Sequence, residues 1–209
     1  MSKSNWVVCS IFLVLFALFA YLASQSYTFP GDIAVSLWLQ SINLPGFYSL
    51  MVAISFLHSW YSAVVVVALV SGGLLFSGKR LEVIFIILLT GLSSLLNSLL
   101  KWLISRPRPG GEIQMLTESN GFSFPSGHIV YATVFYGFIF YLTPKLIKRT
   151  AVVTIIRVVL VLLILLTVTS RIYLGAHWLS DALGSFWLSG LLLIVTVNLY
   201  NNYTWRKNA

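Results

Sequence analysis

The sequence predicts an all-α membrane protein with about six transmembrane helices in one bundle. Of its 209 residues, 58% are hydrophobic and only 9% are charged, whereas soluble domains carry about 25% charged residues. Apolar runs of about 20 residues, the length of a helix that crosses a bilayer, recur along the chain. Proline and glycine clusters or basic turns separate these runs. We therefore expect residues 1–209 to form a single membrane-embedded domain.

The first half of the chain is expected to supply three spans, at about residues 6–24, 50–76 and 81–104. The first run and its preceding lysine resemble a signal peptide, but the later spans favour a retained helix. Residues 27–47 contain two Pro-Gly pairs and form a connector between the first two spans. Apolar side chains inside this connector recur at helical spacing, which indicates a short helix in the membrane interface.

The second half begins with the longest polar connector, residues 105–124. Three further spans are expected after it. The fourth starts at Ser126 and ends near Pro144, the fifth covers about residues 151–169 and the sixth about residues 178–200. A basic turn separates the fourth span from the fifth.

The net charge of +8 reflects how basic residues are distributed between the two ends of the bundle. With the N-terminus in the cytoplasm, eight basic residues lie at cytoplasmic ends, among them Lys207, and only four lie opposite. This asymmetry is the usual bias of multi-pass membrane proteins and gives no reason to invoke nucleic acid. The compact chain suggests a bacterial plasma membrane. The four exceptions are Lys101, Arg106, Arg108 and Arg171. A single cysteine, Cys9, excludes an internal disulfide.

Pro125-Ser126-Gly127-His128 opens the fourth span. A serine N-cap followed by glycine presents backbone N–H groups at the positive end of a helix, where phosphate binds readily. His128 on the first turn would face the same anion. Taken alone, the tetrapeptide favours an ordinary capped helix start.

His177 and Asp181 lie four residues apart at the start of the sixth span. Helical side chains tilt towards the N-terminus, so Asp181 can reach one ring nitrogen of His177 and leave the other as a nucleophile. A helix-capping pair at the membrane surface is the alternative. A carboxylate so near a span is costly without a role, which favours the catalytic interpretation.

The four outlying cations are candidates for phosphate binding. Lys101, Arg108 and Arg171 could converge on phosphate oxygens, with arginine suited to bidentate contacts. Arg106 could line the entrance or meet lipid headgroups. Snorkelling to the interface is the alternative for Lys101.

Together, Lys101-x6-Arg108-Pro109, the block at residues 125–128 and Ser170-Arg171-x5-His177-x3-Asp181 resemble the type 2 phosphatidic acid phosphatase family, without departure at the defining positions. The matched core is residues 101–181. The resemblance implies a metal-independent phosphatase with a phosphohistidine intermediate. It implies His177 as nucleophile, Asp181 as its orienting partner and His128 as general acid. It assigns phosphate binding to Lys101, Arg108, Ser126, Gly127 and Arg171.

No cofactor and no metal are expected, since no cluster of ligands is visible in the sequence. The resemblance implies a lipid phosphate substrate, such as phosphatidylglycerophosphate, phosphatidic acid or undecaprenyl pyrophosphate. The distribution of basic residues predicts that the site lies on the extracytoplasmic face. A lipid-linked phosphotransferase would use the same first step, and a lipid or anion transporter is a further alternative. His58, Glu112 and Glu118 are expected to serve packing or solvation rather than chemistry. The oligomeric state is not encoded in any pattern of the sequence.

Overall fold

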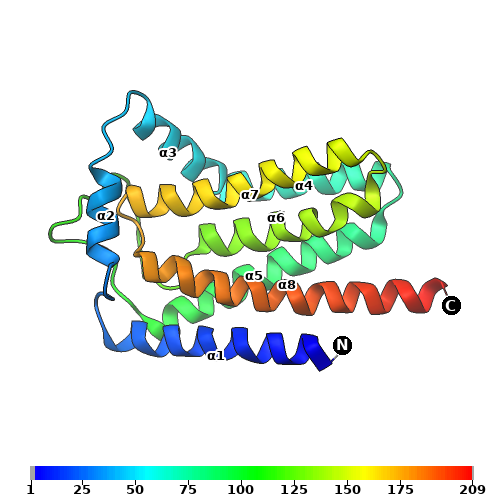
Figure 1. Cartoon of the computed structure of the whole chain (residues 1–209), viewed down its shortest axis with the longest axis horizontal. Helices are drawn as coiled ribbons and strands as arrows, with labels where there is room; N and C mark the ends of the chain where they lie inside the picture. Colours follow the sequence, from blue (N-terminus) through cyan, green and yellow to red (C-terminus); the bar gives the residue numbers. More distant parts are fainter. Residues whose placement is uncertain (1–2, 209) are drawn as a thin grey trace.

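The structure is a computed structural model that describes residues 3–208, except for the side chains of 207 and 208. The side chain of Lys207, counted above, therefore lies outside the described residues. Within this part of the chain there are eight helices and no strand, arranged as one elongated bundle (Figure 1). The helices are α1 (Lys3–Gln25), α2 (Asp32–Gln40), α3 (Phe47–Leu57), α4 (Trp60–Phe76), α5 (Arg80–Ile104), α6 (Gly127–Leu146), α7 (Thr150–Tyr173) and α8 (Leu179–Asn208).

Five of these helices are long and apolar enough to cross a membrane, namely α1, α5, α6, α7 and α8. A sixth span exists if α3 and α4 are counted together. The all-helical, multi-pass fold class is therefore confirmed, and α2 is the short helix expected in the first connector.

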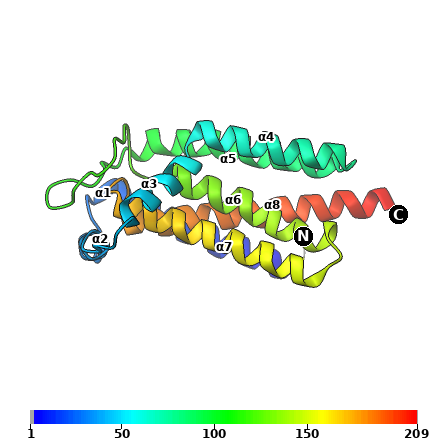
Figure 2. The same cartoon turned by 90° about the horizontal axis from the view of Figure 1, so that it is seen from above.

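The second span differs from the expected continuous helix. It is broken after Leu57, and α3 and α4 meet at an angle of 63°. His58 ends α3, and Ser59 caps α4 by accepting a hydrogen bond from the Ser62 N–H at 3.5 Å. Serine in this role satisfies a backbone donor that a continuous helix would bond internally. As a result α3 points away from the axis of α4, while α4 runs beside α5 (Figure 2).

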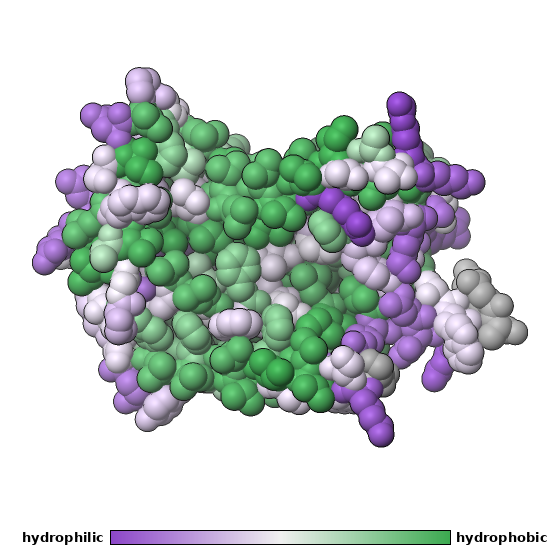
Figure 3. Space-filling model, viewed as in Figure 1, coloured by the Kyte–Doolittle hydropathy of each residue, from purple (hydrophilic) through white to green (hydrophobic). Residues whose placement is uncertain are grey.

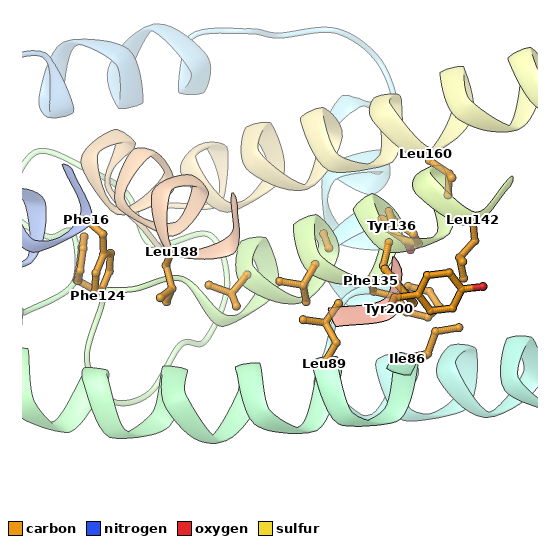
Figure 4. Packing of buried hydrophobic residues seen from close by; sticks show 14 of the residues in the cluster. Phe16, Ile86, Leu89, Phe124, Phe135, Tyr136, Leu142, Leu160, Leu188 and Tyr200 are labelled. Atoms are coloured by element: carbon orange, nitrogen blue, oxygen red, sulfur yellow. The ribbon is translucent and has the colours of Figure 1, made fainter. Parts of the chain in front are cut away.

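Helix α6 is the centre of the bundle. Half of its most apolar stretch is buried, against about a sixth of that of α1 or α7, and it packs against α5, α7 and α8. Its buried side chains join a core that runs most of the length of the bundle (Figure 4). At the site end of this core, Phe16 of α1 stacks on Phe124, with ring centroids 6.0 Å apart.

The outer surface matches a bilayer. A broad hydrophobic belt covers the middle of the face in Figure 3, while hydrophilic residues gather at its two ends. Large apolar side chains such as Phe76, Leu95 and Trp102 are exposed. Exposed apolar area on this scale is expected of a protein whose solvent is lipid. The end that bears α2 and the 105–124 connector holds the site described next.

Candidate active site

A cavity of about 520 Å³ lies at this end of the bundle. It is formed where α5, α7 and the 105–124 connector approach the first turn of α6 and the turn before α8. Six of the predicted site residues line it, from all three sequence blocks: Lys101, Arg108, Gly127, His128, Arg171 and His177. Residues up to 76 positions apart in the chain therefore meet at one cavity.

His177 stands in the turn between α7 and α8, and the turn is fixed by Gly175. The φ angle of Gly175 is +67°, and a Cβ built there would lie 2.2 Å from the Gln114 carbonyl oxygen. Only glycine fits both constraints without strain. The backbone N–H of His177 donates to the Arg171 carbonyl at 3.2 Å, which ties the turn to the end of α7.

The two nitrogens of His177 have different partners. Nε2 lies 3.3 Å from Nη1 of Arg108, and because a guanidinium only donates, Nε2 carries the lone pair. Nδ1 lies 3.4 Å from Oδ2 of Asp181 and is the nitrogen left to hold the proton. Burial, with the neighbouring cations Lys101, Arg171 and Arg108 adding to it, holds the pKa of His177 well below its ordinary value. The ring is thus a neutral base with its lone pair facing the cavity.

Asp181 is fully buried and saturated with donors. It accepts from Arg106 Nη1 at 2.6 Å, from the Trp178 N–H at 3.0 Å, from the Ser123 hydroxyl and from His177. Charge-assisted bonds of this kind fix a carboxylate rigidly. Asp181 can therefore set the orientation of the imidazole and stabilise positive charge that develops on it.

The position of Arg106 differs from the predicted one, at the entrance or among lipid headgroups. Its side chain is fully buried and lines no entrance. It bridges Asp181 and Asp32, with its Nη2 3.0 Å from Asp32 Oδ2, and its guanidinium lies 4.8 Å from the ring centroid of Phe29. Ser180 completes the group, because its N–H and hydroxyl both donate to Asp32. Sequence reasoning gave no role to Asp32, which holds Arg106 against Asp181.

Three cations remain without a counter-ion. Among the residues the structure describes, none of Lys101, Arg108 and Arg171 forms an ion pair. Lys101 donates to the Phe122 and Ser123 carbonyls, and Arg108 to the Ala176 carbonyl at 2.7 Å. Arg171 is only 4% exposed, and its Nε has no hydrogen-bond partner within the part of the chain that the structure describes. Lys101 and Arg108 are half-buried and Arg171 is buried, and cations withdrawn from water in this way are costly unless an anion occupies the cavity.

The start of α6 meets part of the expectation. Gly127 and His128 line the cavity, but Ser126 is fully buried and does not line it. The Ser126 N–H donates to the Ser185 hydroxyl at 2.8 Å, so this amide is already occupied, and the Ser126 hydroxyl has no partner in residues 3–208. An anion at this helix start would therefore meet the N–H groups of the residues after Ser126.

The residues expected to serve packing or solvation lie in different places. His58 is buried at the α3–α4 bend, where its Nδ1 lies 2.7 Å from the Ile54 carbonyl and its ring packs edge-on against Tyr136. This is the packing role expected of it. Glu112 and Glu118 are both exposed, but only Glu118 lines the cavity.

These contacts define the chemistry the site can perform. A neutral imidazole oriented by a carboxylate, a second histidine and three unpaired cations suit attack on a phosphoryl group whose charge the cations hold. In residues 3–208 no three His, Cys, Asp or Glu side chains are grouped as ligands of a metal ion.

Known proteins of the same kind support this description. The family model of the PAP2 superfamily matches residues 82–205, which include every predicted site residue. Phosphatidylglycerophosphatase B of Bacillus subtilis (strain 168) is 34% identical over 190 residues, which is 88% of this chain and 91% of that protein.

Two solved structures share the fold. The crystal structure of the first transmembrane PAP2 type phosphatidylglycerolphosphate phosphatase from Bacillus subtilis superposes with a TM-score of 0.82 at 26% identity, over 93% of this chain and 96% of that one. LpxE of Aquifex aeolicus gives a TM-score of 0.62 at 20% identity, over 82% and 95% of the two chains, a likeness of fold alone. Because the family model covers more than half of its length, this chain belongs to the PAP2 superfamily.

Proposed function

We propose that this chain is a membrane lipid phosphatase that removes the terminal phosphate of a lipid phosphate, with phosphatidylglycerophosphate as the first candidate substrate. The observation that carries the proposal is the cavity lined by Lys101, Arg108 and Arg171, cations without an ion pair among the described residues, beside a neutral His177. The relative in Bacillus subtilis is a phosphatidylglycerophosphatase, which supports that choice of lipid.

In the proposed reaction, Nε2 of His177 attacks phosphorus and forms a P–N bond while the bond from phosphorus to the lipid oxygen breaks. His128, at the first turn of α6, gives its proton to the departing oxygen. Asp181 stabilises the positive ring through Nδ1. Water then attacks the phosphohistidine, gives a proton to His128 and releases inorganic phosphate, which restores both histidines.

The three cations and the amides of Gly127 and His128 would hold the phosphoryl oxygens throughout. We further propose that the site faces the extracytoplasmic side of a bacterial plasma membrane. The bias of lysine and arginine towards the other end of the bundle supports this orientation. A lipid could then keep its chains in the bilayer while its headgroup enters the cavity.

The test is phosphate release by the purified protein in detergent from three lipids: phosphatidylglycerophosphate, phosphatidic acid and undecaprenyl pyrophosphate. His177→Ala serves as the blank. We expect turnover in EDTA, because side chains of this protein supply the positive charge, and inhibition by vanadate, which mimics five-coordinate phosphorus. Complete loss of turnover in EDTA that magnesium restores would contradict the proposal.

A second measurement locates the intermediate. Rapid quenching without acid during turnover of a lipid labelled with ³²P should leave the label on His177. The matched control is His58→Gln, since His58 lies outside the site cavity and its loss should leave the label in place. Label on another residue, or none during turnover, would refute the phosphohistidine step.

A further inference from the structure

A second cavity adjoins the site. It has a volume of about 670 Å³ and lies between α4, α5 and the start of α6. The two helices that form its walls run side by side in Figure 2. Ser59, Gly127 and His128 line both cavities, so the two meet where the proposed general acid stands. Along its outer rim Trp60 and Val64 are exposed, so the cavity opens on the surface that the bilayer covers.

The dimensions of this cavity suit a lipid chain. Its lining extends along α4 from Ser59 to Ser71, which at about 1.5 Å per residue is about 18 Å. The hydrocarbon of one leaflet is about 15 Å deep, half the thickness of the bilayer core. Most of the lining on α4 is alanine and valine. An aliphatic chain needs only such a surface and asks for no hydrogen bonds.

Two polar groups at the site end of this cavity therefore need a different explanation. Asn97 of α5 is 7% exposed; its Oδ1 is buried without a hydrogen-bond partner, and its Nδ2, the donor of the amide, donates no hydrogen bond among the described residues. The hydroxyl of Tyr131 on α6 is buried and likewise unpartnered there. Leaving such a group unsatisfied costs about 1–3 kcal/mol. Neighbouring Thr90 differs, because its hydroxyl donates to the Ile86 carbonyl at 2.8 Å.

Both groups stand next to the phosphate site. A Cβ placed on Gly127 would lie 3.2 Å from Nδ2 of Asn97, so this amide rests against the first turn of α6. Tyr131 follows His128 by three residues and therefore projects from the same face of α6, one turn along the cavity. A ligand held by its phosphate in the first cavity would pass these two donors as it entered the second.

We propose that Asn97 and Tyr131 bind the ester carbonyl oxygens of an acylated glycerol phosphate, and so make the enzyme selective for glycerophospholipids over polyprenyl phosphates. This inference rests on the proposed lipid phosphatase activity. In a diacylglycerol phosphate the ester carbonyls lie a few bonds from phosphorus, and they accept hydrogen bonds from amide and hydroxyl donors. A polyprenyl chain carries no acceptor beyond its phosphates and would leave both donors unpaired. Sites with buried hydrogen-bonding groups reject ligands that lack the partner.

The experiment compares diacyl phosphatidic acid with its dialkyl ether analogue, which has the same chains and phosphate but no carbonyl groups. Both are presented at equal mole fraction in the same mixed micelles, and kcat/KM is measured for each. We expect the normal protein to prefer the ester lipid by about 10-fold or more, since each hydrogen bond contributes a factor of about 3 to 10. Asn97→Leu and Tyr131→Phe should each reduce the ester-to-ether ratio by about 3- to 10-fold.

Thr90→Val is the matched control. It changes a polar residue in the same cavity whose hydroxyl is already bonded, so the ratio should stay as in the normal protein. Tyr131→Phe removes one oxygen only and keeps the assay decisive if Asn97→Leu fails to fold. A ratio near one in the normal protein, or a ratio unchanged in both variants, overturns the inference while leaving the phosphatase proposal intact. Absence of phosphate release from any lipid would instead refute the phosphatase proposal itself.

Discussion

The buried group of Asp32, Arg106 and Asp181 offers the sharpest prediction about stability. Asp32 accepts four hydrogen bonds, at 2.7–3.0 Å, from Phe29, Ser180 and Arg106. In Asp32→Ala, Arg106 keeps one carboxylate instead of two and the donors of Ser180 lose their acceptor. Breaking a buried ion pair from one side costs about 3–5 kcal/mol. For a protein of this size that corresponds to a fall in unfolding temperature of about 6–20 °C.

The same substitution should slow the reaction without weakening substrate binding. Asp32 does not line the site cavity, and it acts on the chemistry through Arg106, which orients Asp181, and through Ser180, which precedes Asp181. A misplaced orienting group costs up to about 100-fold in rate. We expect kcat to fall by about 10- to 100-fold while KM stays close to normal, because the three unpaired cations are untouched. Phosphate release is measured well below both unfolding temperatures.

The matched control is Glu112→Ala, which also removes one carboxylate. Glu112 is exposed and forms no ion pair among the described residues, so its loss should change the stability by less than about 0.5 kcal/mol. If Asp32→Ala unfolded at the same temperature as the control and retained its kcat, the structural role given to Asp32 would be wrong. A raised KM with unchanged kcat would instead show that Asp32 serves binding.

Three further predictions follow from the site. In a protein carrying His58→Gln and His128→Asn, His177 is the remaining histidine, and its carbon NMR signal at pH 6.0 should be that of a neutral ring, because burial and nearby cations lower its pKa. An ordinary imidazole would be about three-quarters protonated at this pH. A titration midpoint at pH 6.5 or above would contradict the assignment. Gly175→Ala should lower stability and activity sharply, since a Cβ there meets the Gln114 carbonyl at 2.2 Å, whereas Gly46→Ala, with φ +80° but open space, should cost only about 1 kcal/mol; equal losses would refute the steric argument. Inorganic phosphate should stabilise the folded protein, by about 2.7 kcal/mol at 100 times its Kd, as measured by thermal unfolding in detergent; an unshifted unfolding temperature at saturating phosphate would argue against the anion site.

The site residues that line the first cavity could be predicted because each belongs to a motif that is recognisable from short-range spacing in the sequence. His128 is fixed by a helix start, and His177 with Asp181 by the spacing of one helical turn. Features of this kind can be recognised in the sequence alone. The same is true of the membrane spans, because long apolar runs such as those of α1 and α5 directly predict membrane-spanning helices.

The supporting contacts could not be predicted in this way. Asp32 at the start of α2 looks like an ordinary acidic residue in a first helical turn, and its partner Arg106 is 74 residues away. Arg106 repeats the Arg-Pro pattern of Arg108, and although the motif spacing from Lys101 selects Arg108 for the phosphate, nothing in the sequence says that Arg106 is buried against Asp181. The one available signal for Asp32 was the small number of acidic residues, because in a chain with only five of them each carboxylate is a candidate for a specific role.

The break between α3 and α4 was missed for a related reason. Hydropathy averages over a window, and the run from Phe47 to Phe76 stays apolar across His58 and Ser59. The interruption depends on Ser59 acting as a cap, and on the burial of His58 against Tyr136, which is a contact made only in the folded bundle. Tertiary packing, not local propensity, decides where this span bends.

The central position of α6 bears on how the protein copes with different lipids. Bilayers of unequal thickness are accommodated by tilting of helices, and the helices that face lipid, such as α1 and α7, carry that adjustment. Helix α6 is sheltered from it on most sides, and its first turn presents Gly127 and His128. Gly127 and His128 are in this way sheltered from the bilayer, whereas Arg171 stands on the lipid-facing helix α7. An enzyme of lipid turnover, whose own product alters the surrounding bilayer, would keep this part of its site constant as its environment changed.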